Sequence, residues 1–85
     1  VTYRVTALIR RTRQKEVLPW LEQKLEQANY PLSELDIEPF GEQDIEISAV
    51  LLATSIDGDE LDALMKTLGE HPRIKQIFWR ASTTD

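Results

Sequence analysis

The side chains that could do chemistry in this sequence are fifteen carboxylates and one histidine, and there is no cysteine. Without cysteine the chain can form neither disulfides nor thiolate metal sites, and a single imidazole cannot form a histidine pair. His71 stands directly before Pro72, after a predicted helix, where we expect a structural residue and not a catalytic base. The hydroxyl groups lack an activating neighbour in the sequence; they are Ser48, Thr54, Ser55 and Thr67. We therefore expect no enzymatic activity and no cofactor.

The densest acidic segment, residues 57–62, could be a cation-binding loop. An EF-hand loop would require an oxygen ligand where Leu61 stands and a glycine where Asp62 stands. Carboxylates also gather at helix starts, because they complement the positive end of the helix dipole. We therefore expect Asp57 to be the N-cap of a helix and Glu60 to be its capping-box partner.

A second group of carboxylates flanks a predicted turn that contains Pro39 and Gly41. If the two flanking strands pair, these groups share one sheet face, where like charges repel. A hydrated Mg²⁺ ion could relieve the repulsion, and so could Arg4 and Arg10 of a neighbouring strand. We expect a solvated edge without a metal. The alternative metal ligands are Asp36, Glu38, Asp44 and Glu46.

One basic stretch, residues 10–15, contrasts with the net charge of −5. It could meet phosphate, anionic lipid headgroups or an acidic partner, but it contains no aromatic residue and no glycine. Nucleic-acid binding depends on cations that neutralise phosphates, so the overall acidity argues against it. We expect a solvated connection and no nucleic-acid partner.

Two periodicities alternate along the chain. Apolar residues at every second position predict strands at 2–10, 33–38, 44–54 and 74–80. Helical spacing predicts helices at 15–29 and 58–68. Pro19 fits only the first turn of the first helix, and Gly69 is predicted to be the left-handed residue that ends the second.

This order predicts an α+β fold: one ferredoxin-like βαββαβ sandwich over residues 1–85. Right-handed crossovers give a four-stranded antiparallel sheet with strand order 4-1-3-2 and both helices on one face. Trp79, and not Phe78, should point inward. The predicted core consists of Val5, Ala7, Ile9, Leu21, Leu25, Ile37, Ile47, Leu51, Leu64, Leu68 and Trp79.

The sheet face without helices should present a second apolar set. We expect its members to lie side by side, and a contiguous exposed apolar patch usually marks a contact surface. This predicts a protein-interaction face, for self-association or for another protein partner. Its residues are Leu8, Val50, Leu52 and Phe78.

Several segments resemble one family. They are 50–53 (VLLA), 59–64 (DELDAL) and the ending from Pro72 to Trp79, with the pattern Pro-x-Ile-x-x-Ile-x-Trp. Together they resemble the C-terminal domain of the MgtC/SapB family, the magnesium-transporter-C proteins. The resemblance covers nearly the whole chain, and the ending is its most specific part.

The resemblance implies an ACT-like domain on the cytoplasmic side of a bacterial inner-membrane protein linked to magnesium limitation and virulence. The implied function is regulation or protein interaction without catalysis. Because the chain begins with Val1, we expect a domain excised from a longer protein, whose missing N-terminal region provides the membrane anchor. The alternative is an ACT-like domain that senses a small ligand or a divalent cation. ACT domains bind amino acids with a glycine-containing loop after the first strand; here residues 10–14 lack glycine, so no ligand residues are carried over.

Overall fold

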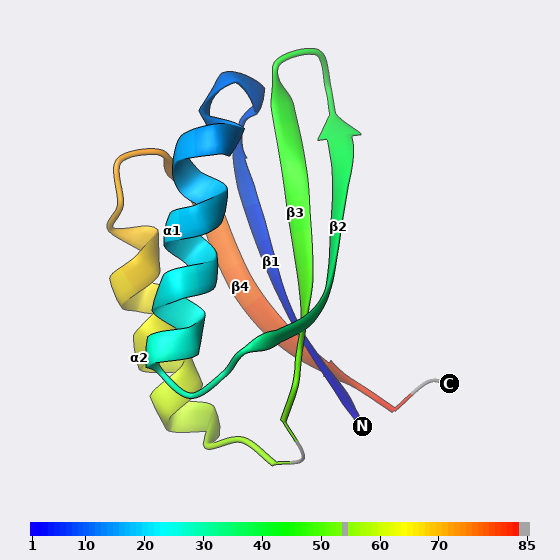
Figure 1. Ribbon diagram of the computed structural model, residues 1–85, viewed down its shortest axis with the longest axis vertical. Coiled ribbons are helices and arrows are strands. Elements are labelled where there is room, and N and C mark those ends of the chain that lie inside the picture. Colours follow the sequence, from blue (N-terminus) through cyan, green and yellow to red (C-terminus); the bar gives the residue numbers. More distant parts are fainter. Residues whose placement is uncertain (54, 84–85) are drawn as a thin grey trace.

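The computed structural model describes residues 1–53 and 55–83. Its elements, in order, are β1 (Thr2–Arg10), the 3₁₀ turn η1 (Arg11–Arg13), α1 (Gln14–Gln27), β2 (Leu32–Phe40), β3 (Asp44–Leu51), α2 (Gly58–Gly69) and β4 (Ile74–Ser82). The strands form one antiparallel sheet in the order β2-β3-β1-β4, and both helices cover the same face (Figure 1). The predicted α+β fold, strand order and helix placement are confirmed.

The strand bounds differ from the predicted ones at four ends, and the smallest difference is the start of β2, at Leu32 instead of residue 33. The third strand ends at Leu51 and not at residue 54, and Thr54 lies outside the described residues. β2 continues past residue 38 through Pro39, which pairs with Ile45. A proline is tolerated there because β2 is an edge strand, and an edge strand has backbone N–H groups that need no ladder partner. β4 extends two residues past the predicted end, to Ser82.

α1 buries the side chains of Val17, Leu21 and Leu25, which lie on one stripe of the helix. The helix begins at Gln14, directly after η1, one residue before the predicted start. Pro19 therefore lies in the second turn, and its predicted place in the first turn is wrong. It has no N–H to donate to the carbonyl oxygen four residues earlier, but the site is exposed and water can bind that oxygen.

The end of α1 is formed by Asn29, whose φ of 68° is left-handed. The N–H of Asn29 donates to the carbonyl oxygen of Glu26 at 3.0 Å, and the N–H of Tyr30 donates to that of Leu25 at 2.8 Å. These two bonds form a Schellman motif. The helix itself ends at Gln27, two residues before the predicted end.

The start of α2 confirms the predicted N-cap. One carboxylate oxygen of Asp57 accepts from the backbone N–H groups of Asp59 and Glu60, at 3.0 and 3.1 Å. The predicted capping box is wrong, because Oε1 of Glu60 instead accepts a hydrogen bond from the Tyr30 hydroxyl at 3.0 Å.

Gly69 has a different role from the predicted one. It is the last residue of α2 and does not have a positive φ. A Cβ atom at this position would lie 3.4 Å from Cγ2 of Ile77 on β4. The absence of a side chain therefore allows α2 to approach the sheet closely, and the predicted left-handed conformation is wrong.

The core lies between the sheet and the two helices. Most of the predicted core residues are buried, but Ile37, Leu64 and Trp79 are only partly buried. Trp79 does point toward the helices, because it pairs with Val5, and its Nε1 donates to Asp62 on α2 at 2.7 Å. Buried apolar residues that were not predicted for the core are Val17, Tyr30, Ile45, Ala49, Leu61, Met65 and Ile74.

Candidate functional site

The helix-free face of the sheet, called the open face below, contains the predicted interaction residues in two separate pairs. Phe78 pairs with Thr6, and Leu8 is the next residue of β1 on the same face, so these two apolar side chains are diagonal neighbours. Val50 lies across the sheet on β3, and Leu52 follows directly after that strand with 65% of its surface exposed.

Polar residues separate the two apolar pairs, so the predicted side-by-side patch is wrong. The register places Arg4 beside Val50, and Thr6 between Ser48 and Phe78. Arg4 Nη1 donates to Ser48 Oγ at 3.0 Å, which ties β1 to β3 across the middle of this face. The alternation of side chains gave the correct face, but only the register determines which residues become neighbours.

The charges on the open face are divided between its two sides. The acidic half, on β2 and β3, contains Glu34, Asp36, Glu38, Asp44 and Glu46; the basic half, on β1 and β4, contains Arg4, Arg10 and Arg80. Within each half, two like charges lie directly opposite each other: Glu38 faces Glu46, and Arg4 faces Arg80. Like charges in direct cross-strand pairs destabilise a sheet.

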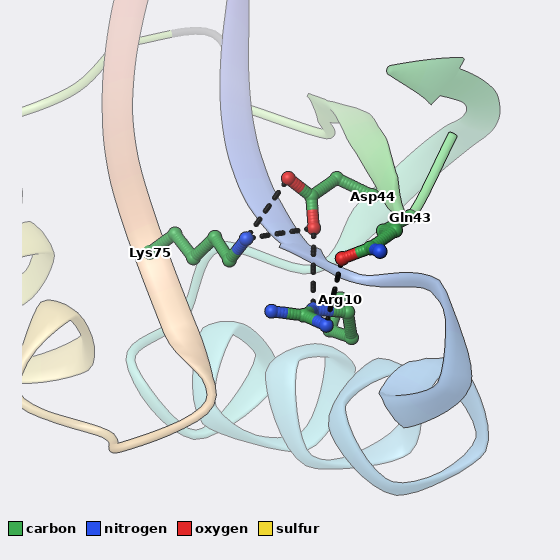
Figure 2. A network of polar contacts seen from close by, with 4 residues as sticks. All are labelled: Arg10, Gln43, Asp44 and Lys75. Carbon is green, nitrogen blue, oxygen red and sulfur yellow. Dashed lines mark hydrogen bonds and ion pairs between the residues drawn. The ribbon is translucent and has the colours of Figure 1, made fainter. Parts of the chain in front are cut away.

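Asp44 is occupied by cations of its own chain (Figure 2). Its carboxylate oxygens accept from Lys75 Nζ at 2.8 and 2.9 Å, and Arg10 Nε lies 3.6 Å from Oδ1. The sequence suggested the contact with Arg10. It did not suggest Lys75, the extra residue of a bulge in β4 between Ile74, opposite Ile9, and Gln76, opposite Leu8.

The other three alternative metal ligands do not converge on one point. Asp36 faces Ser48, whereas Glu38 and Glu46 face each other. Within residues 1–53 and 55–83, no group of three or more His, Cys, Asp or Glu side chains is close enough to hold a metal ion.

The acidic segment at the start of α2 is used for structural contacts. Asp57 caps the helix, Glu60 binds the Tyr30 hydroxyl, and Asp62 binds the Trp79 indole. These contacts attach the first turn of α2 to the chain after α1 and to β4. Burial raises the pKa of Tyr30, and its hydrogen bond to Glu60 raises it further.

We expect the Tyr30→Phe variant to change the alkaline stability of the domain. Because the folded state raises the pKa of Tyr30, the unfolded chain releases the phenol proton first. The stabilisation of the folded state by the neutral Tyr30 phenol is therefore complete below about pH 10 and decreases as pH rises further. Below pH 10 the variant should be less stable by about 1 kcal/mol. Urea unfolding at pH 8 and above pH 10 should show that the difference in free energy of unfolding between wild type and variant is smaller at the higher pH. An equal difference at both pH values would contradict the raised pKa of Tyr30.

His71 connects the α2–β4 segment to α1. Its Nδ1 accepts a hydrogen bond from the backbone N–H of Arg73 at 3.0 Å. Its ring lies against that of Trp20 on α1, with 4.4 Å between the ring centroids and an interplanar angle of 50°. Both contacts are structural.

Comparisons with known proteins agree with this fold. The family model of the MGTC/SAPB C-terminal domain matches residues 3–79. The solution structure of the C-terminal domain of the MgtC protein from Mycobacterium tuberculosis is similar, with a TM-score of 0.80 at 22% sequence identity, covering 95% of this chain and 86% of that one. The search of curated proteins gave no significant match. Of the helices in the described part of the chain, neither has the length and apolarity to cross a membrane.

Proposed function

Since this chain belongs to the MgtC/SapB C-terminal domain family, we propose that it is a non-catalytic regulatory domain of an MgtC-like bacterial inner-membrane protein. The domain would work on the cytoplasmic side, in a protein linked to magnesium limitation and virulence. The contacts of Asp57, Glu60, Asp62 and His71 support a role without catalysis, because these polar groups hold the fold together.

The domain acts by protein contact through its open face, and the contact is with a second copy of this chain. The observation that supports this proposal is the division of that face into an acidic and a basic half, while both helices lie on the opposite side (Figure 1). Complementary potentials of this kind favour one relative orientation of two surfaces.

A two-fold axis parallel to the strands, between β3 and β1, places the acidic half of each copy on the basic half of the other. Glu34, Val50, Arg4 and Arg80 form one row across the sheet. The axis therefore brings Glu34 of one copy to Arg80 of the next, twice in the dimer, as an isologous interface requires. The like-charge pair of Arg4 and Arg80 in each copy then lies next to the Glu34 carboxylate of the other copy.

The size of the face indicates weak association. A strand of nine residues is about 30 Å long, and four strands span about 19 Å. The flat area of the open face is therefore about 570 Å² per copy. This is below the roughly 800 Å² per partner of a stable interface. We therefore expect a dimer that forms only at high protein concentration.

The Leu52→Glu variant tests this contact. Leu52 is largely exposed, so the change should leave the fold intact while placing a charge where the copies meet. Sedimentation equilibrium at several concentrations should show a monomer–dimer equilibrium for the wild type and a monomer for the variant. The control Gln23→Glu introduces the same side chain at an exposed position of α1, and it should show the same monomer–dimer equilibrium as the wild type. A wild type that remains monomeric at millimolar concentration would exclude self-association.

A further inference from the structure

Two connections far apart in the sequence meet at one end of the molecule and form a depression of about 290 Å³. One is the segment from the end of β1 through η1, and the other is the chain between α2 and the start of β4. Most of the lining side chains are cationic. The lining residues are Arg10, Thr12, Arg13, Pro72, Arg73 and Lys75.

The carboxylates that contact these cations do not neutralise them. Asp44 contacts Arg10 and Lys75, and Glu16 contacts Arg13 and Arg73. Each carboxylate therefore contacts two cations, which leaves an excess of positive charge in a chain whose net charge is −5.

The arginine ion pairs are loose. Arg10, Arg13 and Arg73 each lie 3.6 Å from the nearest carboxylate oxygen, and each side chain is 41–50% exposed. N–H···O hydrogen bonds are usually about 2.7–3.2 Å long, and exposed ion pairs contribute about 0–1 kcal/mol. Arg10 also donates a hydrogen bond from Nη1 to Gln43 Oε1 at 3.0 Å (Figure 2). The guanidinium groups of Arg13 and Arg73 can therefore bind a ligand without giving up a strong bond.

The start of α1 adds positive potential on the same side. The N-cap of α1 is Arg13, which makes no side-chain capping hydrogen bond. Cations are unfavourable near a helix N-terminus and anions are favourable there. The packing of His71 against Trp20 holds the α2–β4 connection, and with it Arg73, next to α1.

We propose that this depression binds a phosphate group. The planar guanidinium presents a fork of N–H donors that matches phosphate oxygens, and several arginines suit a dianion. The lining contains no aromatic residue that could stack on a nucleobase, so the phosphate itself is what is recognised. The phosphate can come from the free anion or from a lipid headgroup.

The test is a titration of the ¹⁵N-labelled chain with inorganic phosphate, followed by NMR against sodium chloride of equal ionic strength. Amide shifts should saturate and concentrate at Thr12, Arg13 and Arg73. The Arg13→Gln and Arg73→Gln variants should each bind about tenfold more weakly, the size expected for a lost charge-assisted hydrogen bond. Lys24→Gln removes the same charge from the last turn of α1 and should bind as the wild type.

A second arm replaces inorganic phosphate with phosphatidylglycerol vesicles, with phosphatidylcholine vesicles as the neutral control. Vesicle binding that Arg73→Gln weakens and Lys24→Gln does not, without saturable binding of inorganic phosphate, would identify a lipid headgroup as the source. The proposal is overturned if neither probe binds at the depression, or if Lys24→Gln weakens binding as much as Arg73→Gln. Thermal unfolding of each variant shows whether the fold is kept.

Discussion

Replacing Leu61 with alanine should lower the free energy of unfolding by about 3 kcal/mol, the middle of the range for truncating a fully buried leucine. Leu61 is 0% exposed, in the first turns of α2. Small domains are stable by only about 5–15 kcal/mol, so this one change would remove a large part of the total. Urea unfolding followed by circular dichroism measures the loss.

Leu52→Ala is the matched control for this prediction. It removes the same atoms from a leucine that is 65% exposed on the open-face side, and it should change stability by less than about 0.5 kcal/mol. Equal losses at the two positions would contradict the separation of the domain into a buried helix side and an open face.

The second large effect is expected from charge reversal on the open face. In the proposed dimer, Arg80→Glu places a carboxylate opposite Glu34 of the second copy. Glu34→Arg places a guanidinium opposite Arg80 of the second copy. Because the proposed interface is two-fold, each change acts twice, and we expect either variant to dimerise about tenfold or more weakly than the wild type. Arg80 lies 5.2 Å from the Phe78 ring centroid and is exposed, so the fold should tolerate the change. Sedimentation equilibrium measures the dimerisation constants.

The matched control is Lys66→Glu, which reverses a charge at an exposed position of α2, away from the open face. It should dimerise as the wild type does. If it weakened dimerisation as much as Arg80→Glu, net charge and not the pattern of the open face would govern association.

Periodicity, combined with the rule of right-handed crossovers, was sufficient to predict the fold. The alternation in β1 and β3 and the helical spacing of Val17, Leu21 and Leu25 determine which face each element buries. With right-handed crossovers, few topologies remain. The family resemblance rested on segments of the same strands and helix.

The register could not be predicted, and the candidate site depends on it. The bulge that places Lys75 at Asp44 follows from the pairing of β1 with β4, which are distant in the sequence. The pairing of Glu38 with Glu46 depends on the exact register of the β2–β3 hairpin, which the alternation of side chains does not determine. The helix ends were mispredicted because both asparagine and glycine can adopt the left-handed conformation, and because glycine also occurs where two elements pack closely. Asn29, after α1, has the left-handed conformation that was predicted for Gly69 at the end of α2, while the absence of a side chain at Gly69 leaves room for Ile77.

The most direct test of the open face as a contact surface is sedimentation equilibrium of an equimolar mixture of Arg80→Glu and Glu34→Arg. If two copies meet acidic half to basic half, both contacts in the mixed dimer join opposite charges, one between the native Glu34 and Arg80 and one between the two introduced side chains, whereas each variant alone has two like-charge contacts. The mixture should then associate more strongly than either variant alone. A mixture that associates no more strongly than the separate variants would contradict the proposed contact.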